Sequence, residues 1–419
     1  LSDGIRKKNQ EIFGEDLSAT ELVHRIVQEV RYEGDRALFR YTKLLDRVEL
    51  THDNLMVSEE EFLSAERAAD PEVVASLKKA ADNIFAYHEE QKPRSWMTYR
   101  AHGSILGQAV LPLARVGIYV PGGTAAYPSS VLMNAIPAVV AGVEEIIMSV
   151  PTKDGVINPY VLIAARLLGI KKIFKIGGAQ AIAAMAYGTE SVPRVDKITG
   201  PGNIFVTLAK KEVYGHVDID MLAGPSEILI LADESASAEY VAADLLSQAE
   251  HDPLASSILI TTDMELAQES LTEVQKQLET LPRKNIARAS LEGHGCIIVT
   301  ENMDQAIHLA NVSGPEHIEL LLEDSFHILP RIRCAGAIFL GPYSPEPLGD
   351  YFAGPNHVLP TGGTARFYSV LNVETFMKRT SIISYTQEAL NDVSEDIIRL
   401  AETEGLDAHA RAIQMRRGR

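Results

Sequence analysis

The sequence contains only two cysteines, Cys296 and Cys334, in 419 residues. Both flank or enter stretches that we expect to be strands, so neither a disulfide framework nor a thiolate zinc site is available, and we expect packed thiols. No run reaches the roughly 20 apolar residues that a membrane helix needs. The first ten residues, LSDGIRKKNQ, lack the apolar core of a signal peptide. These absences favour a cytoplasmic protein without a membrane partner. Because the chain starts with Leu1, we also expect that a short segment precedes it in the natural protein.

Positive charge is also scarce. The chain has 39 lysines and arginines against 57 aspartates and glutamates, which gives a formal net charge of -18. This balance argues against a nucleic-acid partner and against binding to an anionic membrane. Hydrophobic residues make up 46% of the chain, which is enough to bury two sizeable cores. The composition therefore predicts a folded protein of two or three domains.

The order of the periodic segments predicts four regions. We expect residues 1–112 to be helical, because the capping-box patterns SATE and SEEE precede apolar residues spaced three and four apart. In residues 113–233, and again in 234–363, short apolar runs alternate with helical ones, which is typical of parallel sheets covered by helices. We expect residues 364–419 to form a helical tail. The predicted fold is α/β, with two successive α/β/α units and helical additions at both ends.

Four tight glycine or proline turns lie where strands of the first unit are expected to end: YVPGG at 119–123, GGAQA at 177–181, TGPGN at 199–203 and AGPSE at 223–227. In such sheets, ligands bind outside the carboxyl ends of the strands. Four turns of this kind suggest that the backbone approaches a ligand closely, and a dinucleotide is the natural candidate. However, no G-x-G-x-x-G pattern opens a helix here, so the spacing alone leaves the cofactor open.

Two polar side chains close a predicted helix in the stretch LLSQAEHDP. Gln248 and His251 lie three residues apart on one face, just before Pro253. One interpretation is a polar helix end that meets water, and the other is a pair of side chains that face a bound group. The sequence around the pair is compatible with both.

Further polar residues lie in the irregular stretch GDYFAGPNHVLPTGG and in the tail. The former contains Asp350, and the latter contains His409. Together with Gln248 and His251 they would form a nitrogen and oxygen set suited to zinc or a similar divalent ion, with positions left for substrate. Their spacing does not by itself show that they converge.

An adjacent acid and imidazole follow a Gly-Pro turn in SGPEHIEL. Glu316 and His317 precede the apolar run IELLL, which places them at the mouth of a strand. They are a plausible general-base pair, because imidazole titrates near neutral pH and a neighbouring carboxylate can orient it. The alternative is a solvated pair in a loop.

These motifs resemble those of the histidinol dehydrogenase family, and the resemblance runs from the N-terminal helices to the tail. It rests on GIYVPGG, GGAQAIAAMAYGTESVPRVDKITGPGN, AGPSEILILAD, DLLSQAEHDP, GPEH, GDYFAGPNHVLPT and EGLDAHARA, a highly specific set in this order. The resemblance implies two incomplete Rossmann-like units, similar to those of aldehyde dehydrogenases. It also implies a homodimer with intertwined C-terminal tails.

The resemblance further implies a reaction. L-histidinol is oxidised through L-histidinal to L-histidine, the last steps of histidine biosynthesis, with two NAD molecules used in succession and one zinc ion per subunit. His317 matches the general base, and Glu316 matches the residue that activates water. The matching zinc ligands are Gln248, His251 and Asp350, with His409 reaching into the site of the partner subunit.

The remaining matched positions contact substrate or NAD. Ser226, His357 and Glu404 match substrate contacts, together with the zinc ligands and the catalytic pair. Tyr119, Gln180 and Asn203 match NAD contacts. Two alternatives stay open: a zinc dehydrogenase of the same family that acts on another amino alcohol or diol, and a zinc hydrolase that uses Glu316 as base.

Overall fold

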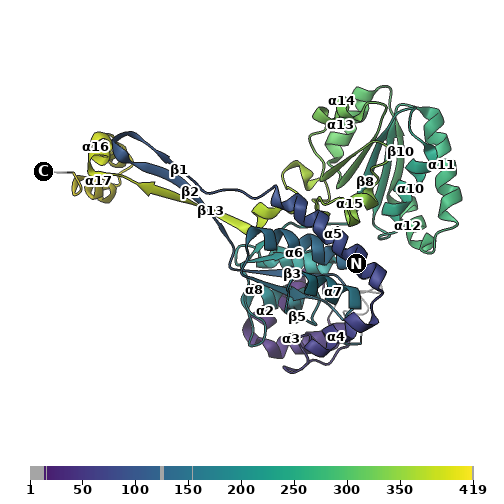
Figure 1. The fold of residues 1–419 in the computed structure, drawn as a ribbon, viewed down its shortest axis with the longest axis horizontal. Helices are drawn as coiled ribbons and strands as arrows, with labels where there is room; N and C mark the ends of the chain where they lie inside the picture. Colours follow the sequence, from purple (N-terminus) through teal and green to yellow (C-terminus); the bar gives the residue numbers. More distant parts are fainter. Residues whose placement is uncertain (1–13, 16, 123–126, 153, 418–419) are drawn as a thin grey trace. The chain divides into compact units, whose positions relative to one another are not determined.

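The computed structural model describes residues 14–15, 17–122, 127–152 and 154–417 (Figure 1). The first ten residues and Gly123, on which two of the expectations rest, lie outside this set. The chain divides into two compact units: a larger unit of Leu1–Gln91 and Ala114–Phe376, and a smaller unit of Lys92–Leu113 and Met377–Arg419. Among the described residues, no helix is long and apolar enough to cross a bilayer.

The N-terminal part of the larger unit is helical as predicted. Its helices are α2 (Ala19–Glu33), α3 (Asp35–Tyr41), α4 (Glu59–Ala68) and α5 (Pro71–Glu89), with a π-helical turn η1 (Thr42–Asp46) after α3. Ser18 and Ser58 cap α2 and α4 through complete capping boxes, in which the serine and the glutamate three residues later satisfy each other's backbone N–H groups. Both capping boxes read from the sequence are therefore confirmed.

The first sheet of the larger unit is parallel, with the order β5-β4-β3-β6-β7. Its strands are β3 (Arg115–Tyr119), β4 (Glu145–Ser149), β5 (Lys172–Phe174), β6 (Lys197–Thr199) and β7 (Asp218–Ile219). Its helices are α6 (Pro128–Ala141), α7 (Pro159–Leu167), α8 (Gly178–Tyr187) and α9 (Ile204–Val213), and α2 packs on α8 and α9. The chain moves outward from β3 to β5 and then returns to the other side of β3. The strand order therefore reverses between β3 and β6.

The second sheet is also parallel, with the order β10-β9-β8-β11-β12. Its strands are β8 (Glu227–Ala232), β9 (Ser256–Thr261), β10 (Gly295–Val299), β11 (His317–Leu321) and β12 (Ala337–Leu340). The helical segments are α10 (Ala238–Ala249), α11 (Met264–Leu278), α12 (Lys284–His294), α13 (Met303–Ser313), α14 (Ser325–Ile328), η3 (Leu329–Arg331), α15 (Glu346–Tyr351), η4 (Thr364–Arg366) and η5 (Val373–Phe376). Two apolar clusters, one under α10 to α12 and one under α13 and α14, cover its faces. The predicted α/β class is confirmed.

Strand β8 belongs to the second sheet, whereas we expected it in the first unit. The predicted first unit, residues 113–233, includes this strand, but the structure pairs β8 with β9 and β11 in the second sheet. The AGPSE turn at 223–227 therefore leads into the amino end of a second-sheet strand. The apolar run EILILA predicts a buried strand correctly, but it carries no information about which sheet the strand joins.

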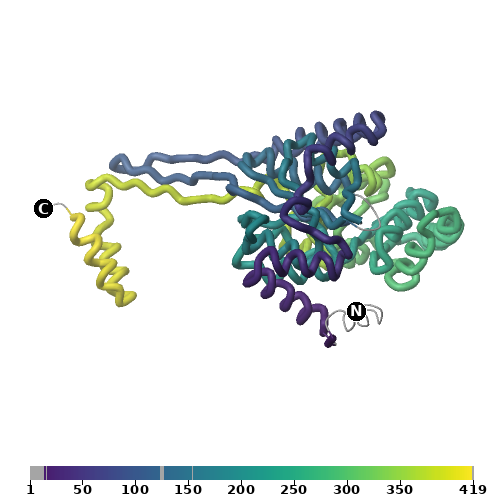
Figure 2. Tube along the Cα trace, turned by 90° about the horizontal axis from the view of Figure 1, so that it is seen from below, coloured from purple at the N-terminus to yellow at the C-terminus, as the bar shows by residue number. Residues whose placement is uncertain are grey.

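The smaller unit contains a three-stranded antiparallel sheet, β1-β2-β13, and two helices. Strands β1 (Trp96–Tyr99) and β2 (Ile105–Pro112) flank the short turn η2 (Ala101–Gly103), and β13 (Met377–Ser384) precedes α16 (Gln387–Thr403) and α17 (Asp407–Gln414). The hairpin and β13 run side by side in Figure 2 as well. The helical expectations are therefore wrong for residues 92–112 and, within the predicted helical tail, for residues 377–384. The reason is that this sheet pairs two segments that lie far apart in the sequence.

The two cysteines are free, as expected, but they are not both packed. Cys334 is half-buried, whereas Cys296 is exposed. Cys296 lies on β10, an edge strand of the second sheet, so its side chain lacks a neighbouring strand on one side. The expectation of a packed thiol is wrong for Cys296.

Candidate active site

Glu316 and His317 lie at the amino end of β11, and both are buried. The backbone of Glu227, the first residue of the neighbouring strand β8, holds both side chains. Its N–H donates to Glu316 Oε2 at 2.9 Å, and its carbonyl lies 3.0 Å from His317 Nδ1. A pair in a solvated loop is thereby excluded.

This geometry determines which nitrogen of His317 is free. A carbonyl oxygen can only accept, so Nδ1 must carry the proton that it donates to Glu227. Burial lowers the pKa of His317 to about 4, so the ring is neutral at pH 7. The lone pair of Nε2 is then available, which is the state that a general base requires.

The carboxyl group of Glu316 is held near the imidazole. Its Oε2 lies 3.6 Å from His317 Nδ1. Burial raises the pKa of Glu316 well above its ordinary value, and the nearby carboxylates of Asp350, Glu227 and Glu346 raise it further, although the N–H of Glu227 opposes them. A carboxylate with a raised pKa is a stronger base when it is ionised, which suits proton transfer from water.

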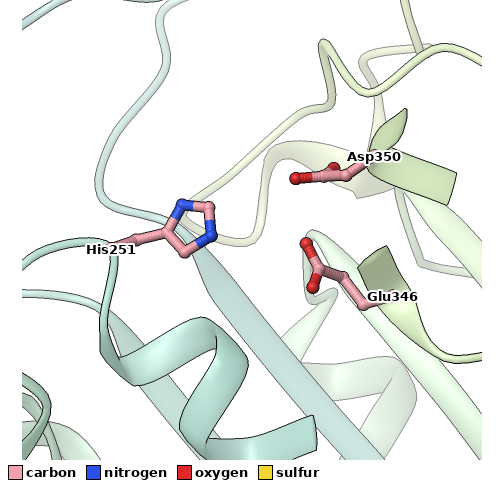
Figure 3. Close-up of side chains that lie close together, drawn as sticks. All are labelled: His251, Glu346 and Asp350. Atoms are coloured by element: carbon pink, nitrogen blue, oxygen red, sulfur yellow. The ribbon is translucent and has the colours of Figure 1, made fainter. Parts of the chain in front are cut away.

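A second group of polar side chains comes from α10 and α15. Gln248 lies at the end of α10, and the N–H of His251 closes the following turn on the Gln248 carbonyl at 3.2 Å. Figure 3 shows the His251 ring facing the carboxylates of Glu346 and Asp350, which lie four residues apart on α15. One ligand atom from each of these three residues lies within 4.8 Å of the other two.

The two carboxylates of this group are crowded. Burial raises the pKa of Asp350 to about 6, and burial together with the Asp350 carboxylate raises the pKa of Glu346 to about 8. Two ionised carboxylates at such separation repel each other, and a cation between them would reverse both shifts. Gln248 is fully buried, and neither its amide oxygen nor its amide nitrogen has a hydrogen-bond partner in the described chain. The donor set therefore fits a divalent cation.

Glu346 is the residue of this group that the sequence analysis missed. We treated residues 349–363 as irregular because of their glycines and prolines, but the first three of them belong to the short helix α15, which begins at Glu346. The spacing of Glu346 and Asp350, four residues apart in EPLGD, would have placed both carboxylates on one helix face had the helix been recognised.

His357 and Ser226 lie close to these groups. His357 Nδ1 lies 3.0 Å from the Asp350 carbonyl, and its Nε2 lies 3.4 Å from Ser130 Oγ. Ser226 directly precedes Glu227, whose backbone holds the catalytic pair. Both predicted substrate residues are therefore positioned by the elements that carry the site.

A cavity of about 490 Å³ opens beside these side chains. His317, Asp350 and His357 contribute to its polar side, and aliphatic side chains of β12 and α15, such as Leu340 and Leu348, line the rest. A mostly apolar cavity of this size with a few convergent polar groups is typical of a small-molecule site.

The predicted NAD residues lie at the carboxyl edge of the first sheet. Tyr119 and Gln180 are buried: the N–H of Gly178 donates to the Tyr119 hydroxyl at 3.2 Å, and Gln180 Nε2 donates to Asp46 at 3.0 Å. Asn203 caps α9 by accepting from the N–H groups of Phe205 and Val206. Contacts of these residues with a dinucleotide stay a prediction.

Glu404 and His409 belong to the smaller unit. Glu404 ends α16, His409 lies in α17, and both are exposed. His251 and Asp350 thus lie close together, and Gln248 lies in the last turn of α10 just before His251. The participation of Gln248, Glu404 and His409 in the same site stays a prediction.

The chain is similar to known proteins over nearly its whole length. Residues 10–417 match the family described as Histidinol dehydrogenase. Histidinol dehydrogenase of Syntrophotalea carbinolica is 57% identical over 94% of this chain and 92% of its own length. That of Halalkalibacterium halodurans is 56% identical over 99% and 98%. The crystal structure of histidinol dehydrogenase from Elizabethkingia anophelis superposes with a TM-score of 0.91 at 40% identity, covering 96% of this chain and 93% of that one.

Proposed function

The chain belongs to the histidinol dehydrogenase family, and from this premise we propose that it oxidises L-histidinol through L-histidinal to L-histidine. The reaction is an NAD-dependent four-electron oxidation at the end of histidine biosynthesis, in the cytoplasm. One observation carries the proposal. The neutral, buried His317 and the carboxylate of Asp350, which faces His251 and Glu346, line a single cavity of small-molecule size.

His317 is the general base of both oxidations. Its Nε2 is unprotonated because Nδ1 donates to the Glu227 carbonyl. It accepts the proton of the alcohol as a hydride leaves the hydroxyl-bearing carbon for NAD. Once this proton has passed to solvent, Nε2 accepts the proton of the aldehyde hydrate as a second hydride leaves for a second NAD.

Glu316 acts on the water that adds to the aldehyde. The N–H of Glu227 holds one oxygen of the Glu316 carboxyl group, which leaves the other for water. The raised pKa makes the ionised group a strong base at that position. No cysteine adduct is required, and neither Cys296 nor Cys334 lies among the residues of the site.

Gln248, His251 and Asp350 would hold a zinc ion, with His409 of a second copy as a further ligand. Glu346 lies beside them and adds a second negative charge. When bound, the ion would act as a Lewis acid that anchors the substrate through the lone pairs of its imidazole and amine nitrogens. Two observations support this assignment: the carboxylates are crowded, and the amide of Gln248 has no hydrogen-bond partner among the residues that the structure describes.

We assign NAD to the edge of the first sheet where the strand order reverses, between β3 and β6. In open parallel sheets this reversal creates the crevice in which nucleotides bind. The turn at 199–203 and the start of α9 lie at this point, and the buried Oε1 of Gln180 has no hydrogen-bond partner within the described residues. Tyr119, Gln180 and Asn203 are the proposed contacts.

We further propose a homodimer with intertwined tails. The smaller unit exposes many large apolar side chains: Trp96, Met97, Tyr99, Ile383, Leu400, Leu406 and Met415. Exposed apolar surface of this extent is typical of an interface. A second copy would cover these side chains and would bring Glu404 and His409 to the partner's site.

The primary test is the amount of NADH formed per L-histidinol consumed, with metal-replete and chelated protein side by side. We expect two NADH per histidinol, lost on chelation and restored by zinc. A single NADH with another amino alcohol or diol preferred would favour the related dehydrogenase. Cleavage of esters or amides without NADH would favour the zinc hydrolase.

A subunit-mixing experiment tests the shared site. His317→Asn and His409→Asn are each expected to be inactive alone. If His409 serves the partner's site, a mixed dimer contains one intact site, so random exchange should restore about a quarter of the activity. If both residues serve the same subunit's site, mixing restores none.

A further inference from the structure

The turn at 199–203 contains a glycine that no other residue could replace. Gly200 follows β6 and has a φ of 116°, a region that L-residues rarely adopt. A Cβ atom at this position would lie 2.0 Å from the carbonyl oxygen of Tyr119, at the end of β3. The residue that follows β6 is therefore packed directly against the last residue of β3, where the strand order reverses.

A buried ion pair holds both backbone groups of this glycine. The N–H of Gly200 donates to Asp220 Oδ2 at 2.8 Å, and Lys210 Nζ donates to the Gly200 carbonyl at 3.0 Å. Lys210 also pairs with Asp220 Oδ1. The side chains of Lys210 and Asp220 are only 3% and 1% exposed. Lys210 comes from α9 and Asp220 follows β7, so the pair joins these two elements to the residue that follows β6.

Stability alone does not explain this arrangement. Removing two charges from water costs free energy, and apolar residues of similar volume often stabilise a fold as well as a buried ion pair does. An apolar pair, however, could not satisfy the N–H and the carbonyl of Gly200 at the same time. The specific contribution of Lys210 and Asp220 is therefore the conformation of the turn.

We propose that Lys210 and Asp220 are positioning residues for the dinucleotide. They hold the Gly200 turn against the end of β3, so that the crevice between β3 and β6 and the adjoining N-terminus of α9 are formed before NAD binds. This inference rests on the proposed NAD-dependent function. It assigns these two residues a role in NAD affinity rather than in the transfer of hydride or protons.

The test is a double variant, Lys210→Met with Asp220→Leu, which removes both charges without leaving either unpaired. The matched control is Lys197→Met with Asp218→Leu. Lys197 Nζ and Asp218 Oδ2 form a 2.8 Å ion pair between β6 and β7 in the same sheet, and Asp218 is half exposed. The other hydrogen bonds of these side chains go to the Thr375 carbonyl and the Ile219 N–H rather than to Gly200. KM and the dissociation constant for NAD, kcat, KM for histidinol and metal content are measured for both variants.

We expect the double variant at Gly200 to raise KM and the dissociation constant for NAD by about tenfold, in line with the loss of charge-assisted hydrogen bonds. Metal content, KM for histidinol and kcat at saturating NAD should stay near the parent values, and the control pair should change none of them. A general loss of folded protein would lower kcat and leave KM unchanged, so the two causes are separable. If the double variant fails to fold, Asp220→Asn, which keeps the size and one acceptor, should show the same shift with a smaller magnitude.

Two results would overturn the inference. An unchanged NAD affinity in a folded variant at Gly200 means that the pair does not position the dinucleotide. An equal loss in the control pair means that the effect belongs to the sheet as a whole. If the parent protein itself neither binds nor reduces NAD, the proposed function fails and this inference fails with it.

Discussion

The two parallel sheets of the larger unit share one topology but place their candidate sites at opposite ends of the strands. In both sheets the chain moves outward over three strands and then returns to the other side of the first one. In the first sheet, the backbone turns that we assign to NAD follow the carboxyl ends of β3 and β6. In the second sheet, His317 opens β11 at its amino end, and Glu227, whose backbone holds it, opens β8. Strand order alone therefore does not locate a site.

The difference lies in the kind of group that each edge supplies. The first sheet supplies backbone, with glycine turns and a helix start that can approach an anionic ligand closely. The second sheet supplies buried titratable side chains whose pKa values are shifted by desolvation. We call the carboxyl ends of the first-sheet strands the binding edge and the amino ends of the second-sheet strands the chemical edge. The following predictions test this division.

The largest effect is expected for His317→Asn. Removing the general base should lower kcat for both histidinol and histidinal by about 10³-fold, within the range typical of general-base catalysis. Steady-state rates with each substrate, together with metal content, measure this. A deficit confined to one of the two substrates would show that the two oxidations use different bases.

The same variant should also change the dependence of stability on pH. The pKa of His317 is lowered to about 4 in the folded protein, from an ordinary value of 6.5. Between these values the unfolded chain binds a proton that the folded chain does not, so stability falls with decreasing pH by about 1.4 kcal/mol per pH unit. His317→Asn should lack this term. Urea unfolding of the metal-free proteins between pH 4 and 7 measures it, and parallel slopes would contradict the assignment.

Glu316→Gln should affect mainly the aldehyde step. The amide cannot take a proton from water, so we expect oxidation of histidinal to slow by about 10²-fold and oxidation of histidinol much less. Rapid-mixing experiments with each substrate separate the steps. Equal losses in both steps, with zinc retained, would contradict the division of labour between Glu316 and His317.

Glu346→Gln should weaken metal binding by about tenfold, since it removes one of the two carboxylates that face His251. Competition with a chelator and the visible spectrum of the cobalt-substituted protein measure this without reference to activity. The matched control is Glu250→Gln. It also replaces a carboxylate with an amide, next to His251 in the sequence, but Glu250 does not belong to the cluster of His251, Glu346 and Asp350. Unchanged metal affinity in Glu346→Gln would leave Glu346 outside the metal site.

The smallest effect is expected at the binding edge. Asn203→Ala removes the side chain that accepts from the N–H groups of Phe205 and Val206, which should cost about 1 kcal/mol of stability. KM for NAD should rise with little change in kcat. A large fall in kcat would place chemistry on the first sheet and break the comparison.

Much of the site could be predicted because each motif carries its own local geometry. Gly314 and Pro315 place Glu316 and His317 at a strand start, and the three-residue spacing of Gln248 and His251 places both at a helix end. Glu346 could not be found in this way, since the glycines and prolines around it concealed a short helix. The hairpin at 92–112 was missed because its third strand, β13, lies about 270 residues further along the chain.

The sequence by itself determined the α/β class, the N-terminal helices and most of the candidate catalytic and metal-binding residues, because periodicity, capping and side-chain type are local properties. Only the tertiary structure decided that β8 joins the second sheet, that Glu346 faces His251, and that the Glu227 backbone selects the tautomer of His317. These outcomes depend on which strands become neighbours, and pairing between distant segments is set by the burial of whole surfaces. Desolvation follows from the same burial, so the pKa shifts that make His317 a neutral base at pH 7 could not be read from the motif alone.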